Sequence, residues 1–509
     1  MSVFQGWRQV GSIKPVFMGD IELFDAVIIG GGPAGTCAAL RLLELGHRVA
    51  LIEQHVFPRP QIGESLSAGV RNIFDYLGAS HLLKGRGYID GLPAQVIWEN
   101  AKDENIEFRN HGGGIMVDRS RLDHDMLQLA VSRGLILFQP AKTETFRNEG
   151  AHWQVVIRVD DKHRELKAVF VLDSRGRSGG RMTDRIITAP PMVALYGNTN
   201  KALMPACTLV EAQKSGWLWG SPLPEDGFRM MAFFAPEDLR QLSPYKLFCD
   251  RISTSLLFKG GLKGFVPSAI QSCMVLNYSH HKPWDNNYIR IGEAAFTLDP
   301  LSSTGVEKAM RFSLQTVVAV NNILKSGDEE ISRHFFEDHM AESVTQHLKW
   351  TSEYYQCAWP ESDNNFWKER ARVNILAKDN ETAFQRKLRL KLSRSILGNK
   401  HDKVTNGAWP ADAIDQLWYK KIRRSPQIKF VKAVCVENDR LLLKNVIQHP
   451  DIEREIAYID NIEIFPLLME TQDMETFADV IYFWSKRMSF EKAKHTALRL
   501  CELGLLEIS

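Results

Sequence analysis

Asp25-Ala-Val-Ile-Ile-Gly-Gly-Gly-Pro-Ala-Gly35 is the stretch of sequence that decides the fold. Its apolar run predicts a buried strand, its glycines predict a tight turn, and the residues that follow predict a helix. Gly30 permits the turn, Gly32 lets backbone N–H groups approach a pyrophosphate, and Gly35 lets the helix pack closely on the strand. The positive N-terminus of that helix favours a phosphate group.

A second apolar run, Val49-Ala-Leu-Ile, ends in an acidic residue, Glu53. This carboxylate follows the glycine turn by about 20 residues, where an acidic side chain can hold a ribose hydroxyl. The order of strand, glycine turn, helix, strand and acid predicts a Rossmann-like dinucleotide-binding unit. No second glycine motif follows another strand in the sequence, so we expect one nucleotide site.

The bulk composition excludes several classes of protein. A net charge of +2 over 509 residues gives no electrostatic case for a nucleic acid or a membrane surface as partner. The seven cysteines are scattered without a CxxC pair or a metal-like cluster, which indicates a reducing compartment and no metal site. The N-terminal residues lack the apolar run of a signal peptide. We therefore expect a cytoplasmic protein.

Changes of composition along the chain predict four regions in an α/β protein. An N-terminal extension covers residues 1–22, and a nucleotide-binding domain covers residues 23–330, with an inserted antiparallel substrate sheet at about 190–287. Residues 331–425 are rich in Trp, Tyr, Lys and Arg and predict a helical region. Residues 426–509 predict a small C-terminal module that resembles a winged helix.

Turn signals predict further strands inside the nucleotide-binding domain. Asn148-Glu-Gly150 and Asp160-Asp-Lys162 divide residues 142–172 into three strands, which we expect to be antiparallel. The third strand ends in Val171-Leu-Asp173-Ser-Arg-Gly176, an acid followed by a glycine. We expect this strand to be buried in the nucleotide-binding sheet.

Three further motifs carry a resemblance to a known family. Pro58-Arg59-Pro-Gln-Ile-Gly-Glu64-Ser resembles the P-R-x-x-[IV]-G-E-S element of flavin-dependent halogenases and their hydroxylase relatives. Asp173-Ser-Arg-Gly176 is similar to the D-G element of aromatic-ring monooxygenases. Gly292-Glu-Ala-Ala-Phe-Thr-Leu-Asp-Pro-Leu-Ser-Ser-Thr-Gly305 resembles the G-D-A-A-x-x-x-D-P-x-x-S-x-G element that lies along the flavin. With the glycine turn, the four elements span residues 24–325.

The resemblance implies an FAD-binding domain of the aromatic hydroxylase type, with FAD as cofactor. It implies that the helix opening at Val306 points its N-terminus at the flavin, where a helix dipole stabilises the negative charge of the reduced ring. Glu293 stands where the family usually has Asp, so its longer side chain changes the hydrogen bond that this acid makes to the ribityl or phosphate part of FAD. The cofactor-binding residues expected from the motifs are Gly30, Gly32, Ala34, Gly35, Glu53, Arg59, Glu64, Asp173, Glu293, Asp299, Pro300, Ser302, Gly305 and Val306.

One position separates halogenases from hydroxylases in this family. Halogenases use a lysine, located between a Leu-Gly pair and a tryptophan, to capture or relay hypohalous acid. Here the interval from Leu77-Gly78 to Trp98 has Asp90 or Gly91 at that register, and the nearest lysine, Lys84, comes too early. A carboxylate cannot replace the amine in halogen transfer, so the resemblance favours a hydroxylase.

A second family signature lies at Gly216-Trp217-Leu-Trp219-Gly-Ser221-Pro, which resembles the W-x-W-x-I-P element of halogenases with Ser221 in place of Ile. In a strand, Trp217 and Trp219 face the same side, either in the core or along a substrate pocket. The candidate catalytic residues are Asp90, Ser303, Trp217 and Trp219. Asp90 is the first candidate for a general base, and His280 with His281 is the second.

The motifs together imply an FAD-dependent monooxygenase in which a flavin hydroperoxide hydroxylates an indole or a phenol. Electrons would come from a flavin reductase or from NAD(P)H. The extra C-terminal residues and the aromatic segment 354–367 imply a bulky, peptidyl or carrier-bound substrate, such as a peptidyl tryptophan in quinone cofactor maturation. A halogenase and a non-catalytic flavoprotein maturation factor remain as alternatives.

The basic residues of 386–394 and 420–424 also leave two interpretations open. They form either a solvated helix face or a docking surface for an acidic protein.

Overall fold

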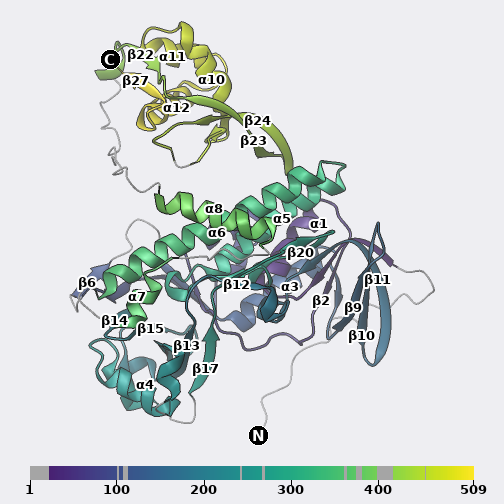
Figure 1. Ribbon diagram of the computed structural model, residues 1–509, viewed down its shortest axis with the longest axis vertical. Coiled ribbons are helices and arrows are strands. Elements are labelled where there is room, and N and C mark those ends of the chain that lie inside the picture. Colours follow the sequence, from purple (N-terminus) through teal and green to yellow (C-terminus); the bar gives the residue numbers. More distant parts are fainter. Residues whose placement is uncertain are drawn as a thin grey trace.

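The computed structural model describes residues 22–99, 103–106, 113–240, 243–265, 270–359, 364–373, 381–397, 416–452 and 454–508 (Figure 1). The expected N-terminal extension, residues 1–22, lies outside this part of the chain except for its last residue, and residues 398–415 of the expected helical region also lie outside it. Within the described residues, no helix is long and apolar enough to cross a membrane.

The largest sheet confirms the predicted α/β fold of the FAD-binding type. Its central strands run parallel in the order β20-β11-β1-β2-β8. Helices α1, α3 and α5 contribute to the core on one face. On the other face, β9 and β10 continue from β11 as an antiparallel extension and enclose a second core. The elements are β1 (Glu22–Ile29), β2 (Val49–Ile52), β8 (Ile136–Phe138), β9 (Lys142–Asn148), β10 (Trp153–Val159), β11 (Lys162–Asp173), β20 (Tyr288–Arg290), α1 (Pro33–Glu44), α3 (Arg119–Ser132) and α5 (Gly305–Leu324).

A second, seven-stranded sheet lies beside the first, in the order β17-β13-β16-β15-β14-β5-β6. Five of its strands come from the segment expected to form an inserted sheet. The other two, β5 and β6, precede that segment, and β5 joins the sheet by parallel pairing with β14. The strands are β5 (Ala94–Ile97), β6 (Asp103–Ile106), β13 (Met192–Thr199), β14 (Thr208–Gln213), β15 (Gly216–Pro222), β16 (Phe228–Phe234) and β17 (Gln271–Val275).

Three helices, α6 (Glu329–Ala358), α7 (Asn365–Arg370) and α8 (Ala383–Leu397), follow α5 and lie between the two sheets and the C-terminal module (Figure 1). Part of the basic stretch on α8 is neutralised within the molecule. Lys387 pairs with Glu337 at 3.1 Å and with Asp338 at 3.2 Å, and both acids are on α6. These ion pairs count against the interpretation of this stretch as a docking surface.

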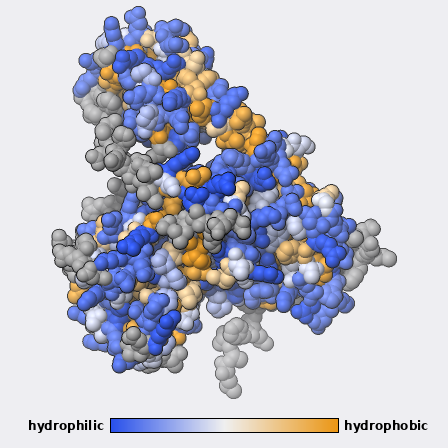
Figure 2. All heavy atoms as spheres, viewed as in Figure 1, coloured by the Kyte–Doolittle hydropathy of each residue, from blue (hydrophilic) through white to orange (hydrophobic). Residues whose placement is uncertain are grey.

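The C-terminal module has its own core around Trp484 and reaches the FAD-binding domain through a hairpin. Its Arg454 also pairs with Glu342 of α6 at 2.6 Å. Its elements are β22 (Ile422–Arg424), β23 (Lys429–Glu437), β24 (Arg440–Gln448), α10 (Ile464–Glu470), α11 (Phe477–Trp484), α12 (Phe490–Glu502) and β27 (Leu506–Ile508). Hydrophobic side chains gather along the β23–β24 hairpin where it leaves the module (Figure 2), and Val436, Leu442 and Leu443 are exposed there.

The turn of this hairpin is seated at the C-terminal ends of α1 and α5. The Asp439 carboxylate forms an ion pair with Arg41 of α1, and its backbone carbonyl accepts a 2.7 Å hydrogen bond from the Asn321 side chain of α5. Asn322 accepts a hydrogen bond from the backbone N–H of Leu441 at 3.2 Å, and the Leu441 side chain enters the core of the FAD-binding domain. The hairpin therefore anchors the module to the domain that carries the nucleotide site.

Leu441→Ala should destabilise the protein by about 2–3 kcal/mol, because it removes a buried side chain from the core and leaves a cavity. Leu442→Ala, one residue away, is the matched control, since Leu442 is 43% exposed whereas Leu441 is 6% exposed. Thermal unfolding measures both effects. Equal melting temperatures for the two variants would contradict the anchoring role of Leu441.

Candidate active site

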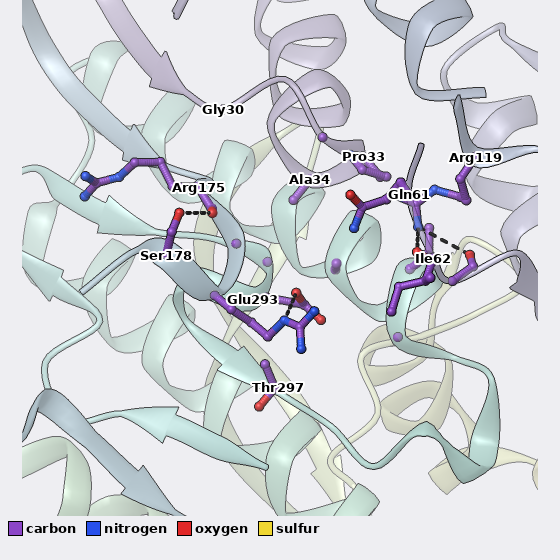
Figure 3. Close-up of a pocket in the computed structure, with 18 of the residues that line it drawn as sticks. Gly30, Pro33, Ala34, Gln61, Ile62, Arg119, Arg175, Ser178, Glu293 and Thr297 are labelled. Atoms are coloured by element: carbon purple, nitrogen blue, oxygen red, sulfur yellow. Dashed lines mark hydrogen bonds and ion pairs between the residues drawn. The ribbon is translucent and has the colours of Figure 1, made fainter. Parts of the chain in front are cut away.

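A cavity of about 700 Å³ lies between the first sheet, the second sheet and the N-termini of α1 and α5 (Figure 3). Its walls come from the loops after β1, β2 and β11 on one side and from β15, β16 and β17 on the other. The carboxyl ends of parallel strands are where an α/β sheet binds its ligand. The size falls within the range of cofactor and substrate pockets.

The glycine turn forms a cradle that fits a pyrophosphate. Gly30 has φ +108°, and a Cβ at this residue would lie 2.6 Å from the carbonyl oxygen of Ser174. A Cβ at Gly35 would lie 2.1 Å from the carbonyl oxygen of Gly30, so this glycine allows α1 to approach β1. Gly32 lines the cavity and has no atom within 4 Å of a Cβ position. The open space is therefore at the N-terminus of α1, where an anion is favoured.

Glu53 lies at the same end of the cavity, at the end of β2. Its carboxylate is buried and accepts hydrogen bonds from the backbone N–H groups of Gly31 at 2.7 Å and His55 at 2.8 Å. These contacts fix the acid against the glycine turn. Glu53 thus lines the cavity in the place where its position in the sequence predicts a ribose-binding carboxylate.

Asp173 differs from the expectation, because Arg175 rather than Asp173 lines the cavity. The Asp173 side chain is fully buried and accepts hydrogen bonds from two guanidinium nitrogens of Arg175, each at 2.8 Å, and from Tyr288 at 2.7 Å. Burial by itself would raise the pKa of the Asp173 carboxyl, but the bonds and charge of Arg175 outweigh it and hold the pKa below its ordinary value. Asp173 therefore positions Arg175 at the cofactor site.

Glu64 and Arg59 both line the cavity, but they do not pair with each other. Glu64 binds Arg229 of β16 at 2.9 Å and accepts the backbone N–H of Gly63 at 2.9 Å. The Arg59 guanidinium lies over the ring of Phe57. The Glu64–Arg229 pair therefore connects the loop after β2 to the second sheet.

Arginines at the start of two helical segments were not anticipated by the motifs. Arg119, at the first position of α3, donates hydrogen bonds to the carbonyl oxygens of Ile62 at 3.2 Å and Gly63 at 3.3 Å, and Asp123 holds its other nitrogens (Figure 3). Arg177, after β11, lies 3.6 Å from Glu293. Both line the cavity. In the sequence, the one sign that these two arginines line the site is that each lies close to a recognised motif or to the start of a helix.

The loop before α5 forms the opposite end of the cavity. Asp299, Pro300, Ser303, Gly305 and Val306 line it, as the motif predicted, and so does Glu293. The Ser302 side chain is not part of the lining, since its hydroxyl pairs with the hydroxyl of Thr304 at 2.6 Å. The α5 N-terminus lies directly after this loop and faces the cavity.

An aromatic wall on β15 and β16 completes the cavity. Trp217 and Trp219 both line it, in agreement with their predicted position on one side of a strand. Trp217 stacks on Phe233 with ring centroids 3.7 Å apart and an interplanar angle of 8°. Met231, two residues before Phe233 on the same face of β16, is paired with Trp219 and also lines the cavity. A planar aromatic ring is the ligand that such a wall fits best.

Asp90 is not brought to the cavity, contrary to the role assigned to it from the sequence. It lies on β4 (Tyr88–Leu92), its side chain is 66% exposed, and it forms an ion pair with Arg71. The pairing of β4 with β7 (Gly114–Val117) is irregular between Ile89 and Leu92, so the strand leaves its regular alternation at Asp90. His280 is also outside the lining, and burial, followed by the charges of Arg290 and His281, lowers its pKa to about 3.

Lys84 is exposed and lies outside the cavity. Among the described residues that line the cavity, Lys142 is the single lysine. It follows Ala141, whose N–H donates a 2.8 Å hydrogen bond to the carbonyl of Glu53. Lys142 is therefore at the nucleotide end of the cavity, away from the aromatic wall.

Gly32→Ala should leave the apoprotein folded and weaken its affinity for FAD about tenfold or more, because the new methyl group enters space that the pyrophosphate would occupy. FAD titration followed by flavin fluorescence measures the affinity, and thermal unfolding of the apoprotein checks the fold. Gly114→Ala is the control, since Gly114 also has open space around its Cβ position but is not in the cavity lining. Unchanged FAD affinity in Gly32→Ala would contradict the cradle.

Arg175→Gln should destabilise the apoprotein by about 3 kcal/mol at pH 7, because it leaves Asp173 buried without its guanidinium partner. The lowered pKa of Asp173 means that the pair stabilises the fold above the ordinary carboxyl pKa and loses this effect as the pH falls through the folded-state value. The difference in the free energy of unfolding between the variant and the parent should therefore become smaller at acidic pH. Urea unfolding at pH 7 and at acidic pH tests this prediction. An equal loss of unfolding free energy at the two pH values would refute it.

Two family models match the chain. A model described as FAD dependent oxidoreductase matches residues 25–178, which contain the glycine turn and Asp173. A model described as tryptophan halogenase matches residues 181–408, which contain the aromatic wall and the loop at Asp299. The two matches therefore cover opposite sides of the cavity.

Individual relatives agree with these models. A tryptophan 2-halogenase of Chondromyces crocatus is 26% identical over 327 residues, which are 58% of this chain and 61% of that protein, less than two thirds of its length. The structure of the flavin-dependent halogenase CmlS matches with a TM-score of 0.71 and 20% identity over 96% of each chain. The peptidyl tryptophan dihydroxylase QhpG matches with a TM-score of 0.66 and 18% identity over 95% of this chain and 99% of its own. The two structures show a shared fold.

The glycine cradle, the carboxylate at Glu53 and the helix N-terminus at the far end fit a long dinucleotide, and the family models identify that dinucleotide as FAD. The comparisons therefore support a halogenase-like flavoprotein with FAD as its cofactor.

Proposed function

We propose that this protein is an FAD-dependent monooxygenase that hydroxylates an electron-rich aromatic ring, an indole or a phenol, on a bulky peptidyl or carrier-bound substrate. A peptidyl tryptophan modified during quinone cofactor maturation is the specific substrate that we propose. The observation that carries this proposal is the composition of the cavity beside the aromatic wall. None of the described residues there supplies the lysine amine that halogen transfer needs.

The electrostatics of the cavity support the same conclusion. Its one lysine, Lys142, is beside the nucleotide end, and Lys84 is exposed outside it. Arg229, the cation on the second sheet, is already paired with Glu64. A cationic amine that would stabilise a halogen-transfer species is therefore missing from the wall formed by Trp217 and Phe233, among the residues that the structure describes.

When FAD is bound and reduced, it supplies the activation of oxygen. The chain contributes position and the exclusion of water. Trp217, Trp219 and Met231 form an apolar face against which a planar ring can stack. The N-terminus of α5 places its positive dipole end toward the flavin site, which favours negative charge on the reduced ring. The single dinucleotide motif favours a separate flavin reductase as the source of electrons.

The proposed substrate class rests on the size of the chain and on one neighbour. QhpG, whose name describes action on a peptidyl tryptophan, has a fold that covers 95% of this chain. A halogenase is the second candidate, because the W-x-W element of β15 and the tryptophan 2-halogenase relative favour it. A non-catalytic maturation factor is the third.

The mass of the product separates these candidates. Purified protein with FAD, a flavin reductase, NADH and air should add oxygen to a tryptophan-bearing peptide, and bromide should not change the product. A bromine isotope pattern in the product would show a halogenase. Tight FAD binding with no modified product from peptides, indoles or phenols would favour the maturation factor.

Lys84→Met is the matched variant for the halogenase alternative. It should leave the rate of oxygen insertion unchanged, because Lys84 is exposed and outside the cavity. A large loss of product in this variant would mean that Lys84 reaches the substrate, contrary to its place outside the cavity.

A further inference from the structure

We infer that Tyr355 is a positioning residue for the flavin-facing loop 300–304, which it holds through the buried carboxylate of Asp299. The helical region after α5 would then fix the ring end of the cofactor site, in addition to any role toward a large substrate. The inference deepens the proposed function, and it rests on that function only for the identity of the substrate.

The contact between Tyr355 and Asp299 is symmetrical and buried. The Tyr355 hydroxyl lies 2.9 Å from each of the two carboxylate oxygens of Asp299 and can donate to either. Tyr355 is 2% exposed and Asp299 is 4% exposed, so water does not compete for this contact. Hydrogen bonds to a charged group are stronger than neutral ones, and a buried acceptor that loses its donor keeps the full cost of desolvation.

Two further donors bring separate segments to the same carboxylate. The Asn277 side chain, between β17 and β18 (Tyr278–His280), donates at 3.2 Å, and the backbone N–H of Leu301 donates at 3.1 Å. Both Asn277 and Asp299 line the cavity. The carboxylate therefore connects the end of the second sheet, the flavin-facing loop and α6.

The loop that follows Asp299 needs such support. Ser303 has φ +51°, a left-handed conformation that a serine adopts at a cost, and α5 begins two residues later at Gly305. Surrounding contacts must hold a strained residue of this kind in place. Asp299 is buried at the start of this loop. Its position therefore sets the position of the N-terminus of α5 relative to the cavity.

The helical region also supplies positive charge to the carboxylate. Burial raises the pKa of the Asp299 carboxyl above its ordinary value, and the charge of Arg370 of α7, which is also buried, opposes this rise. Arg370 is itself held by the carbonyl oxygens of Phe366 at 3.0 Å and Pro191 at 2.6 Å. Tyr355 and Arg370 thus compensate a buried acid that belongs to the FAD-binding domain.

Aromatic packing fixes the Tyr355 ring against the second sheet. Trp98 and Trp367, which also pack against each other, have centroids 6.4 Å and 5.9 Å from that of Tyr355. The Trp98 indole N–H donates to the carbonyl of Tyr354 at 2.8 Å, and the Trp367 indole N–H donates to the carbonyl of Gln213 at 3.0 Å. The hydroxyl therefore has a fixed direction, which is the property that a positioning residue needs.

Tyr355→Phe tests the inference with little change in volume. The variant should bind FAD about tenfold more weakly, which corresponds to the loss of one hydrogen bond to a charged group. It should also change the visible circular dichroism of bound FAD and raise the rate at which the reduced protein releases hydrogen peroxide in air. Tyr354→Phe, the same change one residue earlier on α6, is the control and should keep the parent spectrum.

Asn277→Ala provides an independent variant, because it removes a different donor from the same carboxylate. It should alter the flavin spectrum in the same direction, and the double variant should show less than the sum of the two effects, as groups that share a partner do. If both variants lower only the melting temperature while the flavin spectrum, FAD affinity and peroxide release stay at parent values, Tyr355 is merely structural and the inference is refuted.

These measurements use the FAD-bound protein without an aromatic substrate. A wrong assignment of the substrate would leave the flavin spectrum and affinity of Tyr355→Phe interpretable, whereas a wrong role for Tyr355 would leave the product mass of the parent protein unchanged. Failure of the inference and failure of the proposed function are therefore distinguishable.

Discussion

The close approach of α1 to β1 is the constraint on which the remainder of the structure depends. Gly35 has room for no side chain, because a Cβ there would meet the carbonyl of Gly30 at 2.1 Å. The hydroxyl of Ser174 ties the end of β11 to the same turn, because it lies 2.9 Å from the carbonyl oxygen of Ile29 and 2.7 Å from that of Gly30 and can donate to either. Two strands thus end, and α1 begins, at one point beside the cavity. This arrangement of the backbone is the first requirement for an FAD site, and the side chains that contact FAD depend on it.

Helices α1 and α5 extend from the cavity to the C-terminal module. The N-termini of α1 and α5 face the two ends of the cavity, while their last turns, at Arg41 and Asn321, receive the tip of the β23–β24 hairpin. The C-terminal module is therefore attached to the ends of the helices that lie away from the cofactor. Packing between α1 and α5 supplies a continuous core between these two ends.

The chemistry is decided where the second sheet meets the flavin-facing loop. Trp217 and Phe233 offer a flat apolar wall, and the cations near it are either paired, as Arg229 is with Glu64, or held by carbonyls, as Arg370 is. Such a site favours the binding of an aromatic ring by stacking and leaves the redox chemistry to FAD. The same fold in other proteins supports halogenation, and we propose that the placement of a few side chains separates that reaction from hydroxylation.

The sequence by itself determined the βαβ unit, the FAD site, the family resemblance and the shared face of Trp217 and Trp219, because these features depend on local spacing and strand alternation. The tertiary structure decided which side chains reach the cavity. Asp90 points to solvent because β4 is irregular there, and Arg175 takes the place expected for Asp173 because a buried carboxylate requires a partner. Tyr355 meets Asp299 from 56 residues away, and β5 joins a sheet far along the chain. Contacts of this kind depend on packing between distant segments, which leaves no periodic signal in the sequence.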